Sequence, residues 1–121
     1  MRQLILSFAL FGFVCSGYAQ STSNESLSLQ ACQADTIVLS FDITSPFNIG
    51  NTFSVEMSDA SGNFTGNFVS TNALLAYGVS VGNEIDVLIP DNTTQGLYKF
   101  RMISSNPVLI SDTIPNVIIG A

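Results

Sequence analysis

The chain has 121 residues, with three Lys or Arg, nine Asp or Glu and no His, which gives a formal net charge of −6. This length suits one domain. The lack of His excludes a Ser-His-Asp or Cys-His catalytic site in its usual form and an imidazole metal site, and the acidic balance disfavours nucleic acid and anionic lipid as partners.

Residues 1–19 have the pattern of a secretory signal peptide. Arg2 precedes the almost wholly apolar run Leu4–Val14, and small residues follow at Gly17 and Ala19. A basic start, a short apolar run and a small-x-small end are typical of such peptides, whereas a membrane span needs about 20 apolar residues. We therefore predict cleavage after Ala19, a mature chain of net charge −7 because Arg2 is lost, and no membrane insertion after cleavage.

The two cysteines call for different interpretations. Cys15 resembles a lipid-attachment site, but such a site needs a small residue before the cysteine, and Val14 stands there. After cleavage only Cys32 remains, so no internal disulfide can form. Two interpretations of Cys32 stay open, a small apolar residue in the core and a bridge to another chain.

The polar, serine-rich residues 20–26 are predicted to form a flexible leader, followed by one domain over residues 27–121 that begins with a short strand at Leu27 and Leu29. In the domain, apolar residues recur at every second position, as in strands with one buried face. The residues predicted to point inward are, in chain order, Ile37, Leu39, Phe41, Ile43, Phe53, Val55, Met57, Ile85, Val87, Ile89, Tyr98, Phe100 and Met102. A strand near Phe68 and a last short strand in NVIIG are also expected, whereas residues 74–81 carry no clear pattern.

Proline and glycine are predicted to separate these strands and not to interrupt them. The turn segments are SPFNIGN, SDASGN, PDNTTQG, SSNP and TIPN. About seven short strands with one apolar face each, in a chain of about 100 residues, predict an all-β fold, an immunoglobulin-like two-sheet sandwich.

Lys99 and Arg101, the only cations after Arg2, share the outer face of one predicted strand. In an immunoglobulin-like arrangement this strand, F, pairs with strand C, which carries Glu56 on its outer face. We predict an exposed contact from Glu56 to Lys99 or Arg101. We also expect Tyr98 to form a tyrosine corner, in which the hydroxyl bonds to backbone a few residues upstream. The alternative is a core aromatic with its hydroxyl at the rim.

Two stretches, SPFNIGNTFSVEMSDASGNF and IPDNTTQGLYKFRMISSNP, resemble an immunoglobulin-like or fibronectin-like module of secreted and cell-surface Bacteroidetes proteins. The shared pattern resembles FN-x-GN-x-F, then LSDASGSF, then IP…GYRIRV-x-SSNP, with Lys99 in place of an arginine here. The resemblance runs from about Cys32 to the end and implies a repeated unit or spacer outside the cell. It leaves open whether the chain is a whole protein or one module of a longer one.

We expect no catalytic residue, cofactor or metal. Glu84 and Asp86 share a strand face and are interpreted as solvated carboxylates, and SDASGN and PDNTT as Asx turns, not calcium sites. For ligand contact through aromatic side chains, the candidates are Tyr77, Phe47 and Phe64, and the alternative for each is a loop residue that caps the core.

The tripeptide DTI occurs twice, at Asp35 and Asp112. It resembles the Asp-Ser/Thr-aliphatic acceptor for O-glycans in Bacteroidetes. The resemblance implies glycosylation at Thr36 and Thr113.

The leading hypothesis is a secreted or cell-surface structural or adhesion module without catalytic activity, outside the cell or in the periplasm, whose partner is a protein or glycan at the cell surface. Two alternatives stay open. One is a carbohydrate-binding module that uses the loop aromatics. The other is a self-assembling extracellular filament subunit whose edge strands pair, with the polar leader adding a strand.

Overall fold

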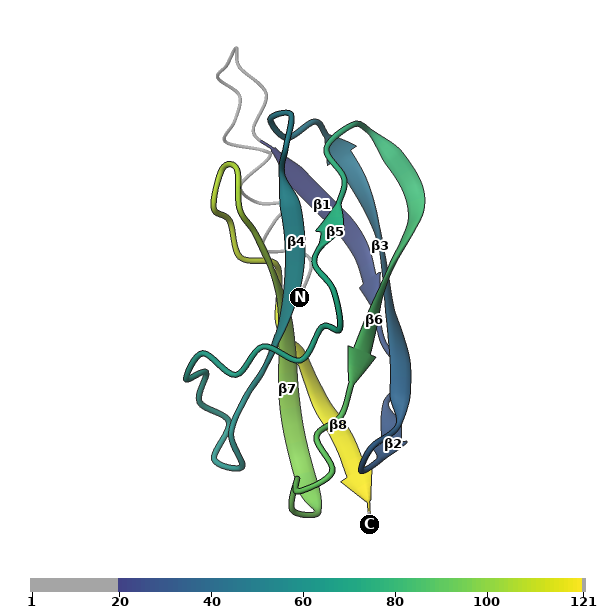
Figure 1. The fold of residues 1–121 in the computed structure, drawn as a ribbon, viewed down its shortest axis with the longest axis vertical. Helices are drawn as coiled ribbons and strands as arrows, with labels where there is room; N and C mark the ends of the chain where they lie inside the picture. Colours follow the sequence, from purple (N-terminus) through teal and green to yellow (C-terminus); the bar gives the residue numbers. More distant parts are fainter. Residues whose placement is uncertain (1–19, 121) are drawn as a thin grey trace.

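The computed structural model describes residues 20–120 and arranges them as two packed β-sheets, with no helix among those residues (Figure 1). The strands are β1 (Ser21–Ser26), β2 (Gln30–Cys32), β3 (Thr36–Ser45), β4 (Thr52–Met57), β5 (Leu74–Leu75), β6 (Ser80–Leu88), β7 (Gly96–Ser104) and β8 (Ile114–Gly120). One sheet has the order β1-β3-β6 and the other β2-β8-β7-β4-β5. The predicted all-β, two-sheet sandwich is confirmed, and the predicted signal peptide lies outside the described residues.

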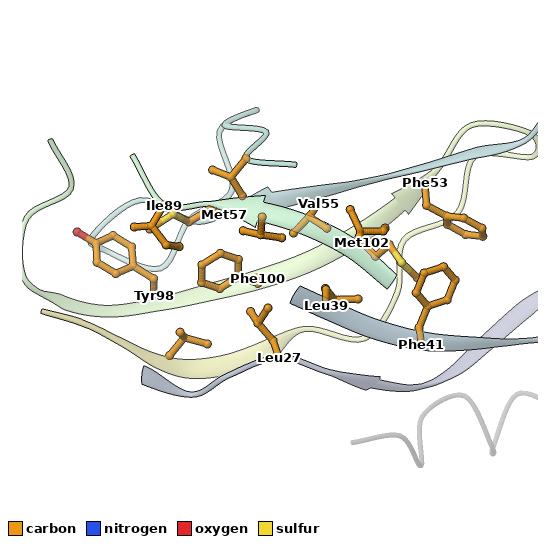
Figure 2. Close-up of a cluster of buried hydrophobic side chains, with 14 of the residues drawn as sticks. Leu27, Leu39, Phe41, Phe53, Val55, Met57, Ile89, Tyr98, Phe100 and Met102 are labelled. Carbon is orange, nitrogen blue, oxygen red and sulfur yellow. The ribbon is translucent and has the colours of Figure 1, made fainter. Parts of the chain in front are cut away.

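The alternating residues predicted to point inward form the core between the sheets. All of them are buried except Ile37, which is half-buried. Figure 2 shows Phe41 of one sheet facing Phe53 of the other, and their ring centroids lie 4.9 Å apart in an edge-on arrangement. Burying a large apolar side chain stabilises the fold by about 1.5–3 kcal/mol, so this period-two pattern fixes which face of each strand points inward.

The prediction of a flexible leader at residues 20–26 is wrong. Ser21–Ser26 forms β1 and pairs antiparallel with β3. Only Thr22 of this strand is buried, so apolar patterning could not reveal it. Its backbone instead covers the edge of β3, which would otherwise present unpaired N–H and C=O groups.

The strand expected at Leu27 and Leu29 is displaced along the chain, since β2 begins at Gln30, after both residues. Leu27 is buried in the connection and Leu29 is exposed. The side chain of Cys32 is free and exposed, so its interpretation as a buried core residue is also wrong. Only three residues of β2 pair with β8, in the parallel direction.

Pro115 lies inside β8, which contradicts the prediction that proline falls only between strands. The pairing of β7 with β8 has a register shift between Tyr98 and Phe100, opposite this residue. On its other side β8 pairs with β2 only from Ile118 onward. Pro115 therefore sits at a bulge on a locally unpaired edge, where its missing N–H removes no ladder bond.

The connection between β4 and β5 follows the edges of both sheets. The expected strand near Phe68 is reduced to two isolated bridges, Glu56 with Phe68 and Ser70 with Val87. The N–H of Val69 donates to the carbonyl of Val55 on β4, and the N–H of Leu88 on β6 donates to the carbonyl of Val69. This segment therefore crosses from one sheet to the other and covers part of the outer edges of β4 and β6.

Candidate functional site

Glu56 and Arg101 stand opposite each other on β4 and β7 and form the predicted cross-strand ion pair. Both Nε and Nη2 of Arg101 lie 2.9 Å from Oε1 of Glu56. The pair is not exposed, however, since the Glu56 side chain is only 4% accessible and that of Arg101 25%. The N–H of Gly66 donates to Oε2 of Glu56 at 2.7 Å, so the β4–β5 connection folds over this face and covers the carboxylate.

Two of the three aromatic residues proposed for ligand contact instead pack against other side chains of the same chain. Phe47 is 6% exposed and packs edge-on against Phe53, with 5.0 Å between ring centroids, which contradicts its assignment as a ligand contact. Phe64 is half-buried, with the guanidinium of Arg101 4.0 Å from its ring centroid in a cation–π contact. Tyr77 alone keeps a large exposed fraction, 40%.

Tyr98 forms the expected corner at the start of β7. Its hydroxyl donates to the carbonyl oxygen of Thr94 at 2.7 Å and lies 3.0 Å from the Thr94 hydroxyl. The phenol ring is buried, so one side chain both fills the core and holds the β6–β7 loop.

The SDASGN segment is an Asx turn. Oδ1 of Asp59 accepts hydrogen bonds from the N–H groups of Ser61 and Asn63, both at 2.9 Å. Over residues 20–120, no group of three or more His, Cys, Asp or Glu side chains is placed to hold a metal ion. Glu84 and Asp86 are exposed on β6.

The residues proposed for O-glycosylation differ in accessibility. Thr36 is exposed at the start of β3, and Thr113 is half-buried just before β8. A glycan is therefore easier to accommodate at Thr36 than at Thr113.

Three loops far apart in sequence meet at one end of the sandwich, the upper end in Figure 1. They are residues 46–51, 76–79 and 105–113, and Asn51 joins them. This side chain is fully buried. Its Nδ2 donates to the carbonyl of Ala76 at 2.9 Å, and its Oδ1 accepts from the N–H groups of Ser105 at 3.1 Å and Asn106 at 2.8 Å.

Further hydrogen bonds tie the same loops together. The N–H of Phe47 donates to the carbonyl of Tyr77 at 2.8 Å, and that of Asn48 to the carbonyl of Asn106 at 3.1 Å. The side chains of Asn48 and Asn106 also bond to each other at 3.0 Å. The stretches FNIGN and SSNP, which carry part of the sequence resemblance, are therefore partners in one structural network.

These loops and the adjoining start of β6 carry exposed apolar side chains, here called the apolar tip. It comprises Ile49, Tyr77, Val79, Val81, Val108 and Leu109. Ile49 and Val81 are the most exposed, at 81% and 82%. In residues 46–51, 76–81 and 105–113 the one charged residue is Asp112, and it is half-buried. Sequence reasoning proposed only Tyr77 of this surface, because its residues come from separate segments and only the tertiary fold brings them to one end.

The sheet edges are poorly suited to pairing with another chain. The β1–β3 pairing is interrupted by two register shifts, β5 and β2 have two and three residues, and Val69 and Thr71 bond to the outer edge of β6. Short, bulged or covered edges are the usual protection against edge-to-edge association.

No family model matches the chain, and no curated protein or solved structure is significantly similar to it. No helix among the described residues has the length and apolar character needed to cross a membrane. A functional assignment therefore depends on the geometry and chemistry of the residues themselves.

Proposed function

We propose that the chain is an immunoglobulin-like module, secreted or held at the cell surface, which has no catalytic role and binds a protein through its apolar tip. The strand order supports the fold assignment: β1, β3 and β6 correspond to strands A, B and E, and β4, β7 and β8 to C, F and G, with β2 and β5 as added edge strands. The tyrosine corner at Tyr98 lies on the strand that corresponds to F.

The predicted export signal supports a location outside the cytoplasm. Residues 1–19 have the composition of a signal peptide, and the matched stretches resemble modules of secreted and surface proteins. Acidic side chains spread over the remainder of the chain favour solubility and disfavour anionic membranes.

The observation that carries the proposal is the apolar tip itself. Exposed apolar side chains that gather on one surface mark interaction sites more often than scattered ones do. Asn51 holds the three loops through hydrogen bonds to Ala76, Ser105 and Asn106, so little loop ordering remains for binding, and that lowers its entropic cost. In antibody variable domains the B–C and F–G loops at this end bind antigen, which is an analogy of fold alone.

The composition of the tip favours a protein over a glycan. Sugar rings stack on aromatic faces and bond through hydroxyls, whereas the tip offers aliphatic side chains and one exposed aromatic, Tyr77. With Phe47 buried and Phe64 under Arg101, the loops lack a platform of several aromatics.

The test is site-specific photocrosslinking in the producing cells. A benzophenone amino acid placed at Ile49 should trap a protein, identified by mass spectrometry, whereas the same group at Ile118, an exposed apolar residue on β8, should not. On a glycan array, the binding signals of the wild type and of Tyr77→Ala should be the same. Adducts of equal yield at both positions, or none at Ile49, would contradict the proposal.

A further inference from the structure

Building on the proposed function, we propose that the protein bound by the apolar tip is a second copy of this chain, so that two sandwiches join end to end. Both copies would then use the same surface about a two-fold axis, the commonest arrangement of homo-oligomers. Such a surface must be complementary to itself. An apolar, uncharged surface meets this condition, because no group on it repels its own copy.

The distribution of charge favours this arrangement over a side-by-side one. The described residues carry nine acids and two cations, and of these only Asp112, which is half-buried, lies in the tip loops. The opposite end carries Asp35, Asp59 and Asp91, and the exposed side of β6 carries Glu84 and Asp86. Two copies side by side would bring these acidic surfaces together.

Joining the tips keeps the acidic bodies apart. The nine residues of β7 span about 30 Å at about 3.3 Å per residue. Charges at the far ends of two joined copies are then separated by several times the Debye length of about 8 Å in physiological salt. Among the other acids, Asp42 on β3 lies nearest the tip loops. Asp42 already accepts hydrogen bonds from Asn24 and Gly82 of its own chain.

The side-chain amides of the tip loops are hydrogen-bonded within the chain, whereas Oδ2 of Asp112 is buried without a partner among the described residues. The side-chain amides of Asn48, Asn51 and Asn106 bond to one another's loops. The surface therefore presents apolar groups with few free donors or acceptors to specify a different partner, which suits contact with an equally apolar copy. The protected sheet edges leave strand pairing as a poorer route to self-association.

The experiment measures mass and distance on the protein purified from its full reading frame in a Cys15→Ser background. Analytical ultracentrifugation over a concentration series should detect a monomer–dimer equilibrium. Cys32 is exposed and pairs with Gly120 at the end opposite the tip, so a spin label attached there reports the geometry. Joined tips predict a label separation of about 60 Å, twice the length estimated from the strand rise. Side-by-side or β2-edge contact predicts much shorter distances.

Charge variants identify the surface. Ile49→Asp combined with Val108→Asp should weaken dimerisation at least about ten-fold, because the dimer would bury unpaired carboxylates. Ile118→Asp, the matched control on β8, should leave it unchanged. All these positions are exposed, so folding should be retained, and circular dichroism and the melting temperature check this.

The outcomes separate this inference from the proposed function. The dimer inference is supported if the chain dimerises, the two labels lie far apart, and only the tip variants weaken dimerisation. A monomer at all concentrations, a short distance or equal sensitivity to Ile118→Asp overturns it. If the photocrosslinker at Ile49 then traps a different protein, the proposed function still stands. If it traps none, both proposals fall.

Discussion

The two ends of the sandwich are each held by one buried polar side chain, but over very different distances along the chain. At the tip, Asn51 bonds to backbone 25, 54 and 55 residues away. At the opposite end, Tyr98 bonds to Thr94, four residues before it. Figure 2 shows the Tyr98 hydroxyl at one end of the core and Phe41 and Phe53 at the other.

This difference bears on what each end can do. The Tyr98 corner closes a single loop, and the acids at that end favour solvent. The Asn51 network sets three loops relative to one another and so creates a surface whose residues come from distant parts of the chain. Long-range hydrogen bonding of this kind is what a defined binding surface needs, whereas local closure suffices for a solvated end.

Loss of the Asn51 side chain should have the largest effect. Asn51→Ala leaves the carbonyl of Ala76 and the N–H of Asn106 without their partner, whereas the N–H of Ser105 keeps its bond to the carbonyl of Thr52. Each group left unpaired costs about 1–3 kcal/mol, so we expect a loss of about 3 kcal/mol in the free energy of unfolding. Urea unfolding measures it. Self-association should weaken as well, because the loops lose their relative placement. Asn48→Ala, which removes an exposed side-chain bond, is the control and should cost less than about 1 kcal/mol.

The pair of Glu56 and Arg101, between the two ends, should rank second. Glu56→Ala leaves the Gly66 N–H and the Arg101 guanidinium without their acceptor. Breaking a buried pair costs about 3–5 kcal/mol. Because Arg101 keeps access to water, we expect about 2 kcal/mol. Lys99→Ala, on the same face of β7 but exposed, should change stability by less than about 0.5 kcal/mol. Similar effects of the two substitutions would contradict the burial of Glu56.

The sandwich and most of its core could be predicted from the sequence, because strand burial follows a local, period-two rule. Residues such as Phe41, Val55 and Phe100 obey that rule, and all are buried. The Glu56–Arg101 contact and the Tyr98 corner also followed from alternation and strand pairing. Predicting the ion pair needs only the register of β4 and β7, and predicting the corner needs only the loop just before Tyr98.

The features that escaped prediction depend on backbone pairing or on loops from distant segments. β1 is held mainly by main-chain bonds to β3, which leave no apolar signature. Glu56 was expected in solvent because nothing in its alternation reveals that the β4–β5 connection covers it. For Phe47 the sequence left open a ligand contact or a loop residue that caps the core, and its ring packs inward against Phe53 as in the second case. The apolar tip exists only once three loops are brought together.

Removing the hydroxyl of Tyr98 should have a smaller, local effect. Tyr98→Phe keeps the buried ring and loses the bonds to Thr94, so the free energy of unfolding should fall by about 1 kcal/mol. Dimerisation through the tip should be unaffected, in contrast to Asn51→Ala. Hydrogen exchange should speed up in the loop around Thr94 and stay unchanged in residues 46–51. A change at the tip of similar size would contradict the local character of this end.

The smallest effect concerns acid sensitivity beside the tip. The side-chain amide of Asn24 and then the N–H of Gly82 donate to Asp42 and hold the pKa of its carboxyl below the ordinary value of 3.8. Because the folded pKa is the lower one, Asp42 stabilises the fold above pH 3.8, and this contribution is lost as the pH falls through the folded pKa. The stability difference between the wild type and Asp42→Asn should therefore shrink as urea unfolding is repeated from pH 5 down to about pH 2. In an Asn24→Ala background the same difference should depend less on pH, since the main cause of the lowered pKa is gone. An unchanged pH dependence there would mean that β1 is not held to β3 through this carboxylate.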